Sequence, residues 1–284
     1  MPGAIAWHLD IRRKMDNLFL SPLQMSKAIS DIGEKKANET IFELFIFGIL
    51  AGMYIAFGAS VATSVLSGGT LDPGLAKFLA GSVFSVGLML VLILGSELFT
   101  GNILMTVGLV YQKYSFGKVI RNWLVVYFGN LLGSVIIAWL VFSSGLLINA
   151  GGLTSIGTVA VKIAETKLQL GFTEALSRGI LCNILVCVAV IMCIGSRTLE
   201  GKILGIYFPI MTFVASGYEH SVANMYFLPA GLMAKGTFAS NFFIIFNNLI
   251  PVTIGNIIGG LLIVLLHPKV EERIARALIR KNNK

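Results

Sequence analysis

Apolar residues dominate the chain from about residue 40 onward and fall into six long stretches separated by short polar segments. Each stretch reaches or exceeds the ~20 residues with which an α-helix crosses the hydrocarbon core of a bilayer. The fifth is too long for one plain span. The pattern therefore predicts an all-α membrane protein with six transmembrane helices, over Ile41–Leu66, Leu75–Leu94, Trp123–Leu147, Phe172–Ile194, Ile203–Ala234 and Phe242–Leu266.

Glycine and polar residues interrupt the second and the fifth stretch. Gly95-Ser96-Glu97 and Thr100-Gly101-Asn102 break the second, and Ser216-Gly217-Tyr218-Glu219-His220 breaks the fifth. Backbone that leaves a helix at membrane depth must find partners in protein or in a water-lined cavity. We therefore expect broken helices two and five that face a cavity, with the carboxylates of Glu97 and Glu219 accepting hydrogen bonds from the freed backbone amides.

Short segments of the first half recur, in the same order, in the second half. They are GILAG at 48–52 with GILCN at 179–183, ELFTGN at 97–102 with EHSVAN at 219–224, and GNLLG at 129–133 with GNIIG at 255–259. Each match is weak alone, but their common order predicts two related halves of three spans. Because three is odd, the second half enters the membrane from the opposite side. Such inverted repeats place their functional site near the midplane, where corresponding helices are interrupted.

The segment before the first span is polar and mixed in charge, without the apolar run of a secretory signal peptide. Ser21-Pro22 is typical of a helix start, with serine as N-cap and proline at the first helical position. We expect an amphipathic helix over Pro22–Lys36 at the membrane surface. The chain then divides into an N-terminal region at 1–39, a transmembrane domain at 40–267 and a basic tail at 268–284.

The composition, 56% hydrophobic and 13% charged, agrees with a membrane protein. The formal net charge of +8 resides mostly before span one, in two alternate loops and after span six. The other loops hold only Lys77, Lys162, Lys167 and Lys235. Because cytoplasmic loops are enriched in Lys and Arg, we expect both termini in the cytoplasm and the protein in the plasma membrane. The basic tail then contacts anionic lipid rather than nucleic acid.

The three cysteines, Cys182, Cys187 and Cys193, all lie in the fourth span. They lack the spacing of metal ligands, and free cysteine is usually a buried packing residue. The sequence indicates neither a metal site nor a cofactor.

Three longer motifs carry a resemblance to a known family. ELFT at 97–100, ASGYEHSVANM at 215–225 and NLIPVTIGN at 248–256 resemble signatures of the formate/nitrite transporter family, and the similarity runs from about Ser21 to the end of span six. The resemblance implies an aquaporin-like fold and a homopentamer in the lipid bilayer. It also implies that each protomer has its own pore for small monovalent anions or their acids.

The resemblance also implies roles for individual residues. The expected substrate-binding residues of the pore are His220, Thr100, Lys167 and Asn183. The expected apolar constrictions consist of Phe84, Leu88, Leu98, Phe99 and Phe213. Apart from the resemblance, the residues expected to support the breaks are Glu97, Glu219, Asn224 and Asn256. Arg178 departs from the family pattern, which has an apolar residue there.

The chemistry of a weak acid favours passage with a proton. The idealised penalty for moving a carboxylate-sized ion into low dielectric is of order 20 kcal/mol. Protonating a carboxylate with a pKa near ~4 at pH ~7 costs roughly 4 kcal/mol. We therefore expect proton involvement at the central histidine, whose reference pKa is near ~6.5, while Lys167 concentrates the anion as a point charge. Formate is the favoured substrate, with nitrite or hydrosulfide as the alternative; lactate is also carried by relatives.

Two other classes fit less well. An aquaporin-type channel for neutral solutes would share the architecture, but neither break contains Asn-Pro-Ala. An intramembrane hydrolase would need a nucleophile, yet Ser221 directly follows the histidine and no Gly-x-Ser-x-Gly elbow is present. We therefore expect no catalytic residues and no enzyme activity.

Overall fold

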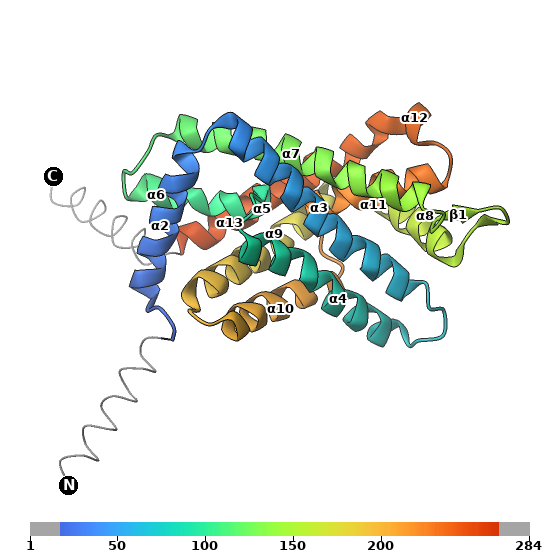
Figure 1. Ribbon diagram of the computed structural model, residues 1–284, viewed down its shortest axis with the longest axis horizontal. Coiled ribbons are helices and arrows are strands. Elements are labelled where there is room, and N and C mark those ends of the chain that lie inside the picture. The colour runs from blue at the N-terminus through green and yellow to red at the C-terminus, as the bar shows by residue number, and fades with distance from the viewer. Residues whose placement is uncertain (1–17, 267–284) are drawn as a thin grey trace, which may run out of the picture.

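Long apolar helices make up most of the computed structural model, which describes residues 18–266 (Figure 1). Five helical segments in this part of the chain are long and apolar enough to cross a membrane. They are α3 (Ile41–Leu66), α4 (Pro73–Leu94), α7 (Phe116–Ser143), α9 (Phe172–Gly195) and the segment Phe238–Leu265, which comprises α12 (Phe238–Asn241), η2 (Phe242–Ile245) and α13 (Phe246–Leu265). The protein is therefore an almost entirely helical, multi-pass membrane protein. The basic tail at 268–284 lies outside the described residues.

The fifth apolar stretch is two shorter helices. They are α10 (Leu199–Ala215) and α11 (Ser221–Ala234), with Ser216–His220 outside any helix between them. The second stretch is α4, which ends at Leu94. The chain then continues as α5 (Phe99–Asn102), η1 (Ile103–Met105) and α6 (Thr106–Val110).

The predicted interruption of the second stretch was too long. Thr100-Gly101-Asn102 is helical, because the chain turns at Gly95 and the backbone N–H of Asn102 already donates to the carbonyl of Leu98. Only the residues from Gly95 to Leu98 leave the helix.

Helix α2 (Pro22–Asn38) precedes the spans, and its predicted start is confirmed. Ser21 Oγ accepts from the backbone N–H of Gln24, and Gln24 Oε1 accepts from that of Ser21. Helix α7 begins well before the predicted Trp123. Its first turns contain polar residues that find partners at the end of α2. Arg121 donates there to the carbonyls of Ala37 and Glu39 at 3.0 and 2.9 Å.

A hairpin and a helix that the hydropathy pattern does not predict follow α7. The hairpin pairs β1 (Ile148–Asn149) with β2 (Gly152–Leu153), and α8 (Ser155–Leu168) comes next. In Figure 1, α8 lies at one end of the molecule and α2 at the other. Lys167 is therefore on the last turn of a helix rather than in a loop.

Two helix pairs cross closely through small residues. Helix α3 packs on α7, and α9 packs on α13. In the first pair, a Cβ added to Gly48 would lie 3.3 Å from Gly129 Cα; in the second, a Cβ added to Gly179 would lie 3.2 Å from Gly255 Cα. Side chains at these crossings would force the helices apart, because small residues are what allow backbones to approach within a membrane.

Candidate functional site

The first break is held by an asparagine from a neighbouring helix. Gly95 adopts a left-handed conformation, φ 81°, and ends α4. The backbone N–H of Phe99, which begins α5, donates to Asn130 Oδ1 at 2.9 Å. Asn130 Nδ2 in turn donates to the carbonyls of Glu97 at 2.9 Å and Gly48 at 2.8 Å. One fully buried side chain on α7 thus supplies partners that the helix lacks at this point.

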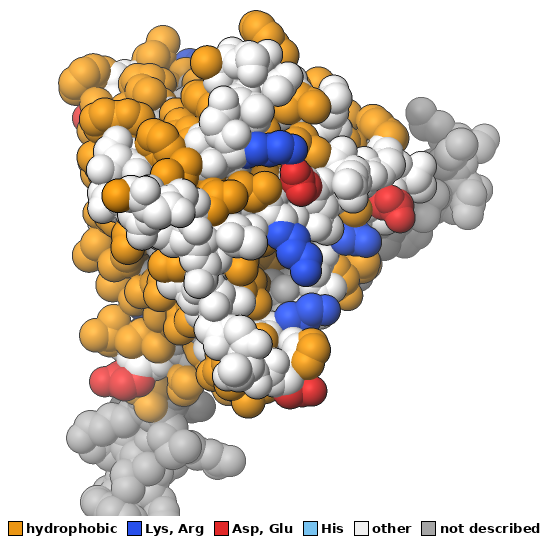
Figure 2. All heavy atoms as spheres, turned by 90° about the vertical axis from the view of Figure 1, so that its right-hand side faces the viewer, with side chains coloured by type: hydrophobic (Ala, Val, Ile, Leu, Met, Phe, Trp, Pro, Cys, Tyr) orange, Lys and Arg blue, Asp and Glu red, His pale blue; other side chains and the backbone are white. Residues whose placement is uncertain are grey.

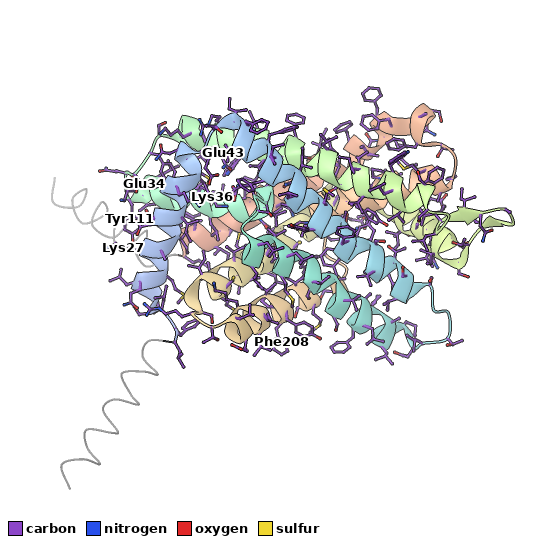
Figure 3. The ribbon with its side chains drawn as sticks, in the orientation of Figure 1. Lys27, Glu34, Lys36, Glu43, Tyr111 and Phe208 are labelled. Atoms are coloured by element: carbon purple, nitrogen blue, oxygen red, sulfur yellow. The ribbon has the colours of Figure 1, made fainter. Side chains whose placement is uncertain are left out.

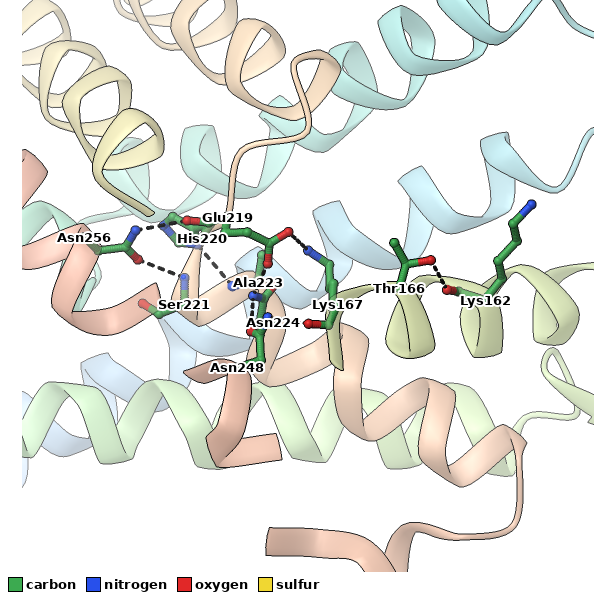
Figure 4. Close-up of polar contacts among 10 residues, drawn as sticks. All are labelled: Lys162, Thr166, Lys167, Glu219, His220, Ser221, Ala223, Asn224, Asn248 and Asn256. Carbon is green, nitrogen blue, oxygen red and sulfur yellow. Dashed lines mark hydrogen bonds and ion pairs between the residues drawn. The ribbon is translucent and has the colours of Figure 1, made fainter. Parts of the chain in front are cut away.

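The second break is held in the same way. Gly217 turns the chain with φ 73°, and the backbone N–H of Ser221 donates to Asn256 Oδ1 at 2.9 Å. Asn256 Nδ2 donates to the carbonyl of Glu219 at 3.0 Å (Figure 4) and to that of Gly179 at 2.8 Å. The asparagine amide is suited to both tasks because it carries an acceptor and two donors on one planar group.

These asparagine bonds correct the expectation for the carboxylates. Glu97 and Glu219 accept no hydrogen bond from the backbone amides of the breaks within the described chain; the side-chain amides of Asn102 and Asn224 donate to them, at 2.7 and 2.6 Å. Each carboxylate instead forms an ion pair with a lysine. The freed backbone groups bond to Asn130 and Asn256.

The two breaks meet at a hydrogen bond between Thr100 and His220. Thr100 Oγ1 and His220 Nε2 are 2.9 Å apart, and both residues are buried. His220 is the N-cap of α11, and its Nδ1 accepts from the backbone N–H of Ala223 at 3.1 Å. Because Nδ1 accepts, the proton of a neutral imidazole lies on Nε2, which donates to the threonine hydroxyl. That hydroxyl keeps its own proton for another acceptor.

Apolar rings surround this pair. Phe213 stacks on the imidazole of His220 with ring centroids 5.8 Å apart, and Phe84 meets Phe213 edge-on at 5.7 Å. Phe99 packs edge-on against Tyr127 of α7 at 5.0 Å. The exposed fraction is at most 3% for all five residues of the expected constrictions, Phe84, Leu88, Leu98, Phe99 and Phe213.

Asn183 joins the two breaks from α9. Its Nδ2 donates to the backbone carbonyls of Thr100 at 3.2 Å and Asn256 at 2.7 Å, which fixes the orientation of the amide. Its Oδ1 is buried and has no hydrogen-bond partner among the described residues. A buried acceptor without a donor is uncommon in folded proteins. This oxygen can therefore take a hydrogen bond from a small bound molecule.

Lys167 forms an ion pair at the α8 side of the site. Its Nζ lies 2.8 Å from Glu219 Oε1, and the two side chains are 15% and 5% exposed. Asn224, which donates to the other oxygen of Glu219, also donates to Asn248 Oδ1 at 2.7 Å, and Asn248 donates to the carbonyl of Lys167 at 2.9 Å. Figure 4 shows this network extending from α8 to the break before α11.

Lys36 forms the corresponding ion pair at the α2 side and was missed in the sequence. Its Nζ lies 2.8 Å from Glu97 Oε1 and donates to Asn102 Oδ1 at 2.8 Å. In Figure 3 it is labelled on α2, at the end of the molecule opposite α8. The internal repeat carried the signal, because Lys36 precedes Gly48 by as many residues as Lys167 precedes Gly179.

A cavity of about 500 Å³ opens beside Lys36. Its lining includes Phe47, Glu97 and Lys202 from three different parts of the chain. Glu39 lies at its edge, where burial raises the pKa of the carboxyl above its ordinary value and the nearby Glu97 adds to that shift. The cavity leads from the α2 end toward the first break.

Comparison with known proteins places the chain in a family. The sequence model of the formate/nitrite transporter family matches residues 23–269. The chain belongs to the formate/nitrite transporter family. As a member, it is a membrane transport protein and not an enzyme, as the sequence predicts.

Individual relatives agree with this assignment. The chain is 44% identical over 265 residues to a probable formate transporter of Methanothermobacter thermautotrophicus, covering 88% of this chain and 96% of the relative. It is 38% identical over 271 residues to the formate channel FocA of Escherichia coli strain K12, covering 88% and 94%. Among solved structures, it is similar to a pentameric formate channel with formate bound, with a TM-score of 0.69, 35% identity and coverage of 79% and 94%.

The asparagine at the second break is open to a direct test. Replacing Asn256 with Ala leaves the Ser221 amide and two carbonyls without their partner, at about 1–3 kcal/mol for each unsatisfied buried group. We expect the midpoint of thermal unfolding in detergent, followed by fluorescence, to fall clearly. Asn247→Ala, an exposed position on the same helix, is the control and should leave the midpoint unchanged. Equal midpoints for the two variants would contradict this role.

Proposed function

We propose that the protein passes formate across the membrane through a pore in each protomer. The observation that carries the proposal is the hydrogen bond between Thr100 and His220, where two broken helices meet among buried apolar rings. Helix N-termini attract negative charge, and α11 begins beside this bond. Relatives described as formate channels and transporters favour formate; nitrite and hydrosulfide, as anions of the same size class, remain the alternative.

The architecture we propose is an aquaporin-like inverted repeat of three plus three spans, assembled as a homopentamer. The equivalent bonds of Asn130 and Asn256 support the repeat, as do the two glycine crossings and the ion pairs of Lys36 and Lys167. In this arrangement the second span is α4 with α5 to α6, and the fifth is α10 with α11. The pentameric assembly of a solved relative supports the oligomeric state.

Substrate crosses the apolar rings as the neutral acid in this proposal. Lys36 and Lys167 stand where an anion would enter from either side, and the rings between them disfavour a bare charge. Neutral formic acid has one hydroxyl donor and one carbonyl acceptor. The free hydroxyl proton of Thr100 suits the carbonyl, and the unpartnered Oδ1 of Asn183 suits the hydroxyl.

In place of the proton involvement expected at the histidine from the sequence, His220 contributes in this proposal as a hydrogen-bond donor that remains neutral while it acts. A second proton on Nδ1 would break the bond from Ala223 and place two donors head to head. The proton that accompanies the anion is then taken up from water at the mouth of the pore. The histidine, through Thr100, holds the resulting acid at the midpoint.

The proposed placement is the plasma membrane, with the α2 end and both termini in the cytoplasm. The alternation of basic loops supports it. The α8 end then faces outward with Lys167, and the cavity beside Lys36 opens to the inside.

Replacement of His220 tests the central pair. Asn at this position can still cap α11 but is too short to reach Thr100, so formate flux into proteoliposomes should fall, by about tenfold for a lost hydrogen bond of ~1.4 kcal/mol. Phe removes both bonds and should abolish flux. The mass in native nanodiscs, expected to correspond to five chains, is the control for assembly. Wild-type flux in His220→Phe pentamers would rule out the pair as part of the pathway.

Orientation is tested by cysteines introduced on opposite sides, since the native Cys182, Cys187 and Cys193 are buried. Ala150→Cys lies in the exposed β1–β2 turn, and Ser115→Cys lies before α7 in an exposed position. A membrane-impermeant maleimide added to intact cells should label the first and spare the second until the cells are opened. The reverse labelling pattern would invert the assignment of the two mouths.

A further inference from the structure

We propose that Arg178 is an anion-attracting residue at the outer mouth of the pore. The inference rests on the proposed function, because it assigns an additional residue to the same pathway. Arg178 belongs to α9, six residues after the helix begins at Phe172, and therefore about 9 Å into the span. Charged side chains at such depth face a cavity or a partner rather than lipid tails.

The backbone places Arg178 beside the second break. Its carbonyl accepts from the backbone N–H of Glu219 at 3.2 Å, and Glu219 is the residue that pairs with Lys167. At the first break, the backbone N–H of Glu97 donates to the carbonyl of Phe47, also at 3.2 Å. Phe47 lines the cavity beside Lys36. Arg178 thus occupies the position in the second half that Phe47 occupies in the first half.

The guanidinium lacks a protein partner. Arg178 is half-buried, and within residues 18–266 its side chain makes no hydrogen bond or ion pair. An unpaired guanidinium at a partly buried position retains its donors and its full charge for a ligand. A small monovalent oxyanion is a ligand with matching charge and geometry.

Two lysines of the outer half are already paired with glutamates. Lys167 is compensated by Glu219, and Lys235 by Glu165 at 2.6 Å. Figure 2 shows the face at the α8 end, where lysine and arginine side chains gather near the centre beside acidic ones. Of the unpaired cations in the described outer half, Lys77 and Lys162 are exposed, so water and salt screen them. Arg178 is the half-buried one, and its field acts on the entrance.

The corresponding inner position is apolar, so the two mouths differ. An anion arriving from outside meets an uncompensated charge beside the constriction, whereas one arriving from inside meets Phe47 and the compensated Lys36. Clefts lined by charges of one sign raise the association rates of oppositely charged ligands about 10- to 1,000-fold. Arg178 should therefore lower the external concentration of formate needed for half-maximal influx, with little effect on the maximal rate.

The test uses right-side-out membrane vesicles from cells that express the full chain, with labelled formate outside. At low ionic strength, Arg178→Leu should raise the half-saturating concentration about tenfold. Arg178→Lys should restore it, and the defect of the Leu variant should shrink near ~1 M gluconate salt, where the screening length is about 3 Å. Lys162→Gln removes an exposed, unpaired charge of α8 and is the matched control, expected to be close to wild type.

The outcomes separate the two proposals. If vesicles with the wild-type protein take up no more formate than vesicles from cells that lack it, the proposed function itself is overturned. Wild-type uptake with an unchanged half-saturating concentration in Arg178→Leu would overturn only the role of Arg178. A defect that Lys does not restore and that salt does not reduce would also overturn it, and would assign the guanidinium to a bond with a lipid phosphate or a neighbouring subunit.

Discussion

Backbone N–H and C=O groups that leave a helix inside a membrane have no water to bind, so the protein must supply a partner for each. Asn130 and Asn256 meet this requirement with the same three bonds, one accepted and two donated. Their positions depend on the glycine crossings that bring α7 onto α3 and α13 onto α9. The central site depends on them in turn, because the bond between Thr100 and His220 forms only if both breaks are held in place.

The charged groups follow the same logic. Each break carries one glutamate, and each glutamate is paired with one lysine and one asparagine side chain, so the charges near the centre are compensated. A compensated pair can be buried at membrane depth, whereas an isolated charge there is expensive. The site therefore combines a nearly neutral interior with cations close to both mouths. This combination suits a substrate that arrives as an anion and crosses as an acid.

The hydropathy pattern was sufficient to predict most long helices and the places where two stretches are interrupted, because length, apolar runs and glycine are local properties. It could not predict α8, whose alternating composition is too polar for a span, and it placed the start of α7 too late because contacts with α2 offset the polarity of its first turns. The partners of Glu97 and Glu219 depend on tertiary packing. The internal repeat held the information for Lys36, but only a comparison at equal spacing from Gly48 and Gly179 reveals it.

The central claim is that formate crosses the apolar rings together with a proton. The most direct test is whether formate entry carries a proton inward and moves no net charge. Proteoliposomes with an entrapped pH dye are given external formate, with the membrane potential either free or clamped by valinomycin and potassium. The account predicts internal acidification at an initial rate that is the same in both conditions and well above that of empty liposomes. Formate entry without acidification, accelerated by an inside-positive potential, would show that the bare anion passes and would contradict the account.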